Sequence, residues 1–268
     1  MPVDKNKEIV QEHIPAQRFA DLILDMGTFL LSSGAHCGRI NSNINRLANT
    51  WGFEINMDPT FKGLLVKVKD KNNPENTVTS YKTSPIYSVH LAVLTNISHL
   101  SWKVQDENLS IEETEKEFAA IKAKPNYKSW QVAIAVGFSC AGLCMFSSGD
   151  IYNALIAFVA AAVGSTFRVK VASMNFNAMI SISIAAFITT LITGLGTLFN
   201  IGAHPEAAMA TAVLYLIPGV PLINCVIDLI EGYLPAAINR ALFGGFILLC
   251  IAAGMTLCIT LIGINNFN

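Results

Sequence analysis

The sequence predicts a membrane all-α protein in which five transmembrane helices follow a small cytoplasmic α+β domain. The first observation behind this prediction is the distribution of charge, which is ordinary up to residue 128 and sparse afterwards. A segment so poor in charge could not cover its apolar surface in water, so we expect it to lie in a bilayer. We therefore expect two domains, residues 1–128 and 129–268. The formally charged side chains after residue 129 are Asp150, Arg168, Lys170, Glu206, Asp228, Glu231 and Arg240.

The second observation is a series of five apolar runs in the second domain. Each run is close to the ~20 residues that a helix needs to cross the hydrocarbon core. Because a backbone in lipid must satisfy its own hydrogen bonds, these runs are expected to be helices. They are Trp130–Ser148, Ile151–Phe167, Ala178–Phe199, Ala207–Ile223 and Ala241–Ile264.

The basic residues between the runs predict the orientation in the membrane. The connection 168–177 contains Arg168 and Lys170, and the connection 224–240 contains Arg240, whereas the remaining connections and the C-terminal tail contain no Lys or Arg. Every basic connection falls on the side of the lysine-rich first domain. The positive-inside rule then predicts an inner-membrane protein with a cytoplasmic N-terminus and an external C-terminus.

The first domain reads as two helices, three short strands and two further helices. Apolar residues recur at helical spacing in the first two segments, and the strands alternate in part between turn-forming residues. Ser110 and Glu113 form a capping-box pattern at the start of the last helix. The predicted elements are Ala16–Ser33, Cys37–Trp51, Phe53–Met57, Leu64–Lys69, Thr77–Lys82, Ile86–Val104 and Ile111–Ala123.

Several classes of function find no support in the sequence. It contains no glycine-rich phosphate loop, zinc-protease motif, serine-hydrolase motif or kinase signature, so we expect neither an enzyme nor a cofactor. A net charge of −1 without a basic stripe argues against a nucleic-acid partner. Cys140 and Cys144 share a helical face but have no further ligand at metal-binding spacing, so we predict no metal site. His36–Cys37 hints at a nucleophile, although no orienting acid lies close in sequence, and Arg39 is expected to form a surface or interdomain ion pair.

Four stretches, in chain order, resemble the threonine/serine exporter (ThrE) family. Their succession covers nearly the whole chain and is more specific than any one of them. The last contains the two prolines of P-G-V-P-L-I-N and resembles the most recognisable membrane motif of the family. The stretches are Leu30–Ile40, Val89–Ile97, Gly164–Ala178, and Pro218–Asn224 followed by Asp228.

The resemblance implies a function and a partner. Full-length members of the family carry ten spans in two unlike halves, so a chain with five is similar to the larger subunit of the split, two-protein form. That form is associated with export of amino acids or of dicarboxylates such as succinate. The resemblance implies a small second membrane subunit with the remaining spans, and it leaves a homo-oligomer open.

The sequence Pro218-Gly219-Val220-Pro221, near the end of the fourth run, is the first candidate site. Proline removes a backbone donor and obstructs the preceding turn, so this sequence is expected to break the helix. Broken helices at membrane depth expose carbonyl groups that transporters use to hold ions and substrates. The alternative is a simple kink or an exit from the membrane.

Asn224 and Asp228 follow this break. Asp228 has two interpretations: an intramembrane carboxylate that binds a substrate amino group or the coupling proton, or a cytoplasmic acid that is solvated or paired with Arg240. Glu231 is expected to be solvated, and Glu206 is expected to stabilise the start of a helix.

Arg168 and Lys170 also have two interpretations. They could attract a carboxylate substrate, or they could only set the topology and contact anionic lipid. Ser173 and Asn177 either add polar contacts at this point or end the connection.

A membrane-anchored ligand sensor or scaffold is the alternative to a transporter. Anchoring requires neither prolines within a span nor a carboxylate beside one, so the sequence favours secondary transport. Because no nucleotide-binding loop is present, an ion gradient or a substrate gradient is expected to drive transport, and the proton gradient is the expected one.

Overall fold

The computed structural model describes residues 14–60, 62–125 and 127–263 of the 268-residue chain. The described part is mostly helical and contains one three-stranded sheet. The chain divides into two compact units. The first unit combines Met1–Lys124 with Val220–Arg240, and the second combines Pro125–Gly219 with Ala241–Asn268.

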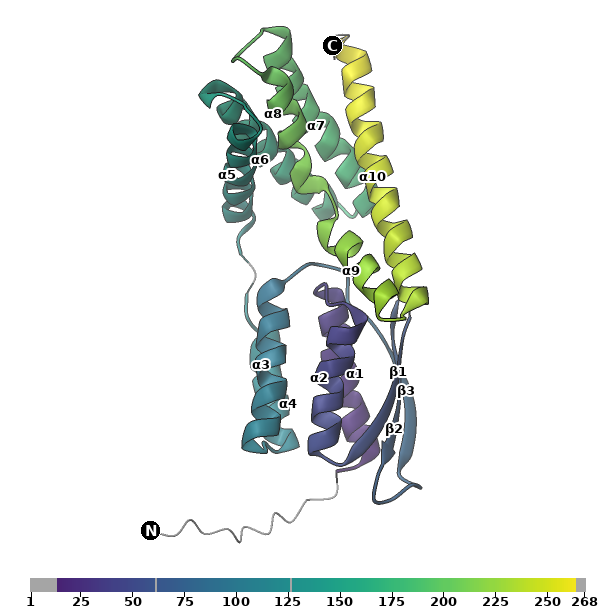
Figure 1. Cartoon of the computed structure of the whole chain (residues 1–268). Helices are drawn as coiled ribbons and strands as arrows, with labels where there is room; N and C mark the ends of the chain where they lie inside the picture. Colours follow the sequence, from purple (N-terminus) through teal and green to yellow (C-terminus); the bar gives the residue numbers. More distant parts are fainter. Residues whose placement is uncertain (1–13, 61, 126, 264–268) are drawn as a thin grey trace, which may run out of the picture. The chain divides into compact units, whose positions relative to one another are not determined.

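The first unit is layered, with the sheet on one side, helices α1 and α2 in the middle, and helices α3 and α4 outside them (Figure 1). The sheet is antiparallel in the order β1-β2-β3. The predicted order of helices and strands is confirmed. The elements are α1 (Ala16–Ser32), α2 (Cys37–Thr50), β1 (Phe53–Pro59), β2 (Gly63–Asp70), β3 (Thr77–Thr83), α3 (Leu91–Glu107) and α4 (Ile111–Lys122).

The core of this unit follows from the two periodicities in the sequence. Helix α1 buries residues three or four positions apart, including Phe19, Ile23 and Met26, which is the spacing of one helical face. Strand β2 buries alternate residues, including Leu64 and Val66. The helical and strand faces meet in one continuous hydrophobic core.

The start of α3 differs from the prediction. The helix begins at Leu91 and not at Ile86, because the preceding segment hydrogen-bonds to the end of α1. The Ser88 N–H donates to the Ser32 carbonyl at 2.8 Å and the His90 N–H donates to the Ser33 carbonyl at 3.0 Å. Tertiary contacts thus hold this segment outside the helix, and the His90 ring caps α3 by accepting from the Val93 N–H.

The second unit is built from apolar helices. Among the described residues of the chain, four helices are long and apolar enough to cross a membrane, namely α5, α6, α7 and α10. A fifth span is obtained only if a bent pair, α8 with η1 followed by α9, is counted as one. The elements after residue 128 are α5 (Ser129–Phe146), α6 (Ile151–Ser173), α7 (Ala178–Leu198), α8 (Pro205–Ala212), the 3₁₀ turn η1 (Leu214–Leu216), α9 (Gly219–Ile230) and α10 (Leu234–Ile262). Nearly all of α9 and the start of α10 belong to the first unit, because that unit includes Val220–Arg240.

The fourth apolar run is not one helix. The predicted run Ala207–Ile223 divides into α8, η1 and the start of α9, with a break at Ile217 and Pro218. Ile217 is extended, with ψ of 128°, because a residue before proline is disfavoured in the helical region. The break predicted from the two prolines is therefore present.

Two predicted connections are largely helical. Residues 168–177 are a connection in the prediction, but α6 continues to Ser173 and the chain turns at Asn175, where φ is 60°. Residues 224–240 contain most of α9 and the start of α10. A helix satisfies its own backbone hydrogen bonds, so it need not stop where the apolar residues stop.

Close helix packing in the second unit depends on Gly254 of α10. A Cβ at this position would lie 2.3 Å from the Ser183 backbone oxygen of α7. The Ser183 hydroxyl donates to the Cys250 carbonyl at 3.1 Å across the same contact. Small residues that allow helix backbones to approach are a common basis of packing in membranes.

We predict that Gly254→Ala lowers the thermal unfolding temperature of the detergent-solubilised protein, because the added methyl group must push α10 away from α7. Overpacking of this kind costs about 1–3 kcal/mol. Gly245→Ala is the matched control, since a Cβ there meets nothing within 4 Å. Equal unfolding temperatures for the two variants would contradict the packing described here.

Candidate functional site

The turn between α1 and α2 presents two backbone carbonyls to side chains from far along the chain. Gly34 ends α1 with φ of +96°, a conformation that favours glycine. Its carbonyl accepts a hydrogen bond from Asn224 Nδ2 at 2.7 Å. The neighbouring Ala35 carbonyl accepts one from Arg240 Nη2 at 2.6 Å. Donor side chains thus satisfy the carbonyl end of this turn.

The first backbone N–H groups of α2 donate to carboxylates from the same late segment of the chain. The Cys37 N–H donates to Asp228 Oδ1 at 2.7 Å, and the Gly38 N–H donates to Glu231 Oε2 at 3.0 Å. The Arg39 N–H lies 3.3 Å from His36 Nδ1, the helix cap. The first N–H groups of a helix lack intrahelical partners and carry partial positive charge, so carboxylates are stabilising there.

Helix α9 presents these acceptors because of their spacing. Asn224, Asp228 and Glu231 are four and three residues apart, which places them on one helical face. The chain then turns at Gly232, where φ is +86°, and α10 brings Arg240 back to the same place. We name Asn224, Asp228, Glu231 and Arg240, together with His36, Cys37 and Gly38, the α2–α9 cluster.

A buried ion pair lies at the centre of the α2–α9 cluster. Arg240 Nε is 2.8 Å from Asp228 Oδ2, and the side chains are 12% and 0% exposed, respectively. This oxygen has the ion pair but no well-aligned hydrogen bond. A buried carboxylate that lost its guanidinium partner would be left as an uncompensated charge, which is strongly destabilising.

Gly38 leaves room for one of the carboxylates. A Cβ at this position would lie 2.3 Å from Glu231 Oε2 and 2.5 Å from the carboxyl carbon. Any larger residue would therefore force the Glu231 carboxylate away from the start of α2.

The Cys37 thiol does not have the properties of a nucleophile. Burial, and then the negative charge of Asp228, raise its pKa to about 12, so the thiol stays protonated at neutral pH. Arg39 also differs from our prediction of a surface or interdomain ion pair. Its guanidinium donates to the Leu94 carbonyl at 3.1 Å and to Ser98 Oγ at 3.2 Å.

The structure brings Asn224 and Asp228 together and places the proline motif just before them. Pro218 precedes α9, Gly219 is its first residue, and Pro221 is buried in its first turn. Proline is tolerated in a first helical turn because the N–H that it lacks would have no partner there.

The other predicted site residues belong to the second unit. Arg168, Lys170 and Ser173 are exposed on the last turns of α6, and Ser173 Oγ donates to the Lys170 carbonyl at 2.7 Å. Asn177 caps α7 by accepting from the Met179 N–H at 2.9 Å. Glu206 lies in the first turn of α8, as predicted.

Sequence reasoning missed two members of the α2–α9 cluster. Glu231 is exposed, as expected, but its contacts were not predicted: its Oε2 accepts from the Gly38 N–H and lies 3.1 Å from His36 Nδ1. The spacing of Asn224, Asp228 and Glu231 would have placed the last on the same helical face as the others. No local sequence pattern connects His36 with Glu231, because the two residues are 195 positions apart in the chain.

The apolar helices of the second unit also contain buried hydroxyl groups. Thr189 Oγ1 is 3.2 Å from the Tyr215 hydroxyl. Thr190 Oγ1 is buried and has no hydrogen-bond partner among the described residues. Polar side chains inside a membrane helix bundle are costly and are a common feature of substrate pathways.

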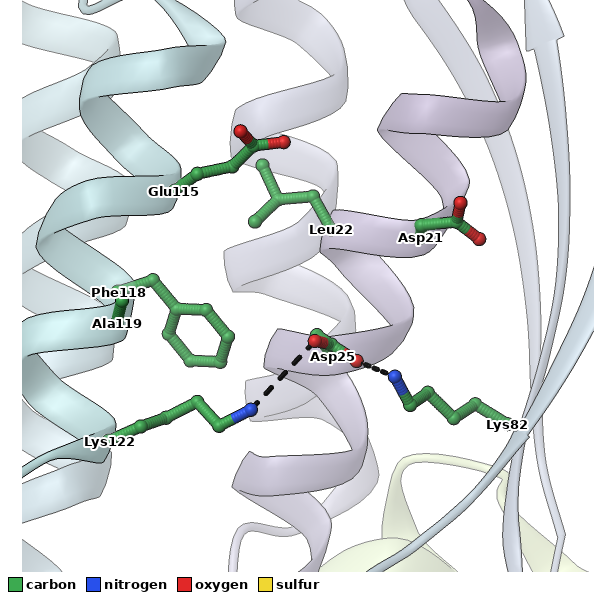
Figure 2. Close-up of a pocket in the computed structure, with 8 residues that line it drawn as sticks. All are labelled: Asp21, Leu22, Asp25, Lys82, Glu115, Phe118, Ala119 and Lys122. Carbon is green, nitrogen blue, oxygen red and sulfur yellow. Dashed lines mark hydrogen bonds and ion pairs between the residues drawn. The ribbon is translucent and has the colours of Figure 1, made fainter.

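A separate cavity of about 320 Å³ lies in the first unit between α1, β3 and α4 (Figure 2). Its charged groups already have partners. Lys82 and Lys122 both reach Asp25, and Glu115 pairs with Arg18 outside the cavity. Asp21 accepts a hydrogen bond from the Gln17 side-chain amide at 2.9 Å, so each of the charged groups that line the cavity has a polar partner. The cavity is lined by Asp21, Leu22, Asp25, Lys82, Glu115, Phe118, Ala119 and Lys122.

Comparison with known proteins shows the family to which this chain belongs. Residues 21–262 match the family model described as "Putative threonine/serine exporter", ThrE, and the chain belongs to this family. It is therefore a multi-pass membrane protein of a transporter family. No solved structure matches it.

Two curated proteins are similar to this chain over most of its length. The chain is 28% identical to the "Probable succinate transporter subunit YjjP" of Escherichia coli (strain K12) and 26% identical to the protein of that name from Klebsiella aerogenes. Each alignment covers 92% of this chain and 95% of the relative. The similarity thus extends through both units.

We predict that Arg240→Gln lowers the free energy of unfolding of the first unit by roughly 3–5 kcal/mol, because it strands the buried Asp228 carboxylate. Adding Asp228→Asn should recover much of the loss, since no charge then remains to be compensated. Denaturant unfolding followed through the fluorescence of Trp51 and Trp102 measures both effects.

Arg18→Gln is the control for this cycle, because Arg18 pairs with Glu115 while 41% exposed and should change stability little. Additive losses in the Asp228–Arg240 double variant would show that the two side chains are not coupled.

Proposed function

We propose that this chain is the larger subunit of a two-component inner-membrane exporter of small carboxylate metabolites, either threonine and serine or a dicarboxylate such as succinate. The observation that carries the proposal is the family match over residues 21–262, which includes the whole α2–α9 cluster. The succinate transporter subunits among the relatives favour the dicarboxylate. A transport role without catalysis also agrees with the protonated Cys37 thiol.

The partner in this proposal is a small second membrane subunit with the remaining transmembrane helices. The word "subunit" in the relatives' names supports it. Five spans, counting the broken segment as one, would place the N-terminus in the cytoplasm and the C-terminus outside, in agreement with the positive-inside rule. A homo-oligomer fits the same scheme, and nucleic acid has no place in it.

The proposed substrate contact is Arg240. A guanidinium binds a carboxylate through paired donors, and in the resting structure Asp228 occupies that position. A substrate carboxylate could replace Asp228 against Arg240 and the Cys37 N–H, so that neither donor is left unsatisfied during the exchange. The displaced Asp228 carboxylate would have to bind a proton or reach solvent, because a buried carboxylate without its guanidinium partner is strongly destabilising.

The break before α9 supplies the moving part in this proposal. Pro218, Gly219 and Pro221 leave the fourth apolar segment without a continuous backbone ladder, so its two parts can reorient during alternating access. Arg168, Lys170, Ser173 and Asn177 are polar groups at the predicted cytoplasmic ends of α6 and α7. They set the orientation and could guide an anion. The proton gradient is the proposed driving force.

We predict that Asp228→Asn and Pro221→Ala each reduce efflux of the true substrate by about tenfold, which corresponds to ~1.4 kcal/mol. The first variant removes the charge that exchanges with substrate, and the second removes a proline ring that obstructs the preceding turn at the break. Efflux is measured in a deletion strain that carries each variant, after loading with succinate or with dipeptides of threonine and serine.

Glu206→Gln is the control for these variants, because it neutralises an exposed carboxylate of the second unit that is not a member of the cluster. Membrane levels of every variant are compared by immunoblot. Normal efflux in both test variants would exclude the site, and unchanged efflux of every substrate in the deletion strain would favour the sensor or scaffold.

A further inference from the structure

The α2–α9 cluster contains a set of possible metal ligands, of which His36 and Glu231 have no part in the proposed exchange of Asp228. His36, Asp228 and Glu231 each offer a ligand atom, and these atoms all lie within 4.8 Å of one another. We propose that the three side chains bind a divalent transition-metal ion of the zinc class. The proposal does not depend on the transport function, because its test measures binding.

The His36 and Glu231 ligand atoms already lie close together, with Nδ1 of His36 3.1 Å from Oε2 of Glu231. A proton on Nδ1 would join the two atoms by a hydrogen bond, and a metal ion would take the place of that proton. Oε2 of Glu231 also accepts from the Gly38 N–H. In a tetrahedral zinc site with bonds of about 2.0–2.1 Å, neighbouring ligand atoms are about 3.3 Å apart. The observed separation is close to this spacing.

Asp228 supplies the third ligand from the preceding turn of α9. Its Oδ1 accepts one hydrogen bond, from Cys37, and its Oδ2 has the ion pair with Arg240 but no aligned hydrogen bond. Each carboxylate oxygen has two lone pairs, so the group retains acceptor capacity. A change of at most about 1.5 Å in side-chain position would bring the three ligand atoms from their present separations, all within 4.8 Å, to the spacing of a zinc site.

The groups around these ligands resemble the outer shell of a metal site. The N–H groups of Cys37 and Gly38 orient the two carboxylates, and Gly38 leaves the space that the Glu231 carboxylate occupies. Such outer hydrogen bonds fix the orientation of metal ligands and raise the affinity of the site.

Charge and access favour a dication. Two carboxylates and one guanidinium leave a net charge of −1 before any proton or metal is added, which attracts a divalent ion. His36 and Glu231 are 27% and 34% exposed, so an ion can enter from solvent and keep a water ligand. Asp228 closes the buried side of the site, because it is 0% exposed.

The ligand set selects the class of metal. An imidazole nitrogen suits zinc, copper, iron or nickel, whereas calcium and magnesium sites are built from oxygen ligands alone. The bound ion would tie the start of α2 to the end of α9, and it would compete with Arg240 for Asp228.

The test measures metal binding by the purified full-length protein in detergent after treatment with a chelator. Calorimetric titration with Zn²⁺ is expected to give one ion per chain, and Co²⁺ is expected to show an absorption spectrum of nitrogen and oxygen ligands. His36→Ser keeps a side chain that can cap α2, and Glu231→Gln keeps an acceptor for Gly38. Each is expected to weaken binding at least about tenfold, or ~1.4 kcal/mol.

The chain provides a matched control pair. His204 Nδ1 lies 3.2 Å from Glu206 Oε1, but the described residues add no third His, Cys, Asp or Glu ligand to that pair. His204→Ser and Glu206→Gln should therefore bind Zn²⁺ like the unmodified protein. Absence of Zn²⁺ binding by a folded protein would overturn the proposal. Equal losses of Zn²⁺ affinity in the two pairs of variants would also overturn it. So would a sulfur-to-cobalt charge-transfer band, because that band would place the ion on the cysteines.

Discussion

The first unit depends on the capping of the α1–α2 turn by side chains from α9 and α10. Asp228 is central because it accepts from the Cys37 N–H through one oxygen and pairs with Arg240 through the other. Arg240 in turn donates to the Ala35 carbonyl. Each end of the turn thus receives the charge or dipole that it needs, and removing one member leaves a buried polar group without its partner.

This capping explains how a segment late in the chain belongs to the first unit. Val220–Arg240 is separated by about a hundred residues from Lys124, the end of the rest of the unit, yet it satisfies backbone groups that α1 and α2 cannot satisfy themselves. The contact is polar and directional. A purely apolar face would hold the segment less specifically, because apolar contacts do not distinguish a carbonyl end from an N–H end.

Local patterns predicted much of the fold. The helices and strands of the first unit follow from apolar spacing, and the capping box at Ser110 and Glu113 is present as expected. Long-range contacts account for the differences. The segment before Leu91 is held by Ser32 and Ser33, and α6 continues past its apolar residues because helical hydrogen bonding does not depend on hydrophobicity.

The candidate site was predictable only in part. The proline motif and Asp228 stand out in a segment poor in charge, and pairing with Arg240 was one of the two interpretations of Asp228. Glu231 and His36 could not be joined by any periodicity, because their contact depends on how α2 and α9 pack. Gly38 likewise reads as an ordinary helix residue until the Glu231 carboxylate lies against it.

The most direct test of this account is hydrogen–deuterium exchange of the Cys37 and Gly38 amides in the full-length protein. The first amides of a helix usually lack partners and exchange fast. Capping by Asp228 and Glu231 predicts slow exchange in the unmodified protein and fast exchange at Cys37 in Asp228→Ala. Fast exchange of both amides in the unmodified protein would contradict the central role of these carboxylates.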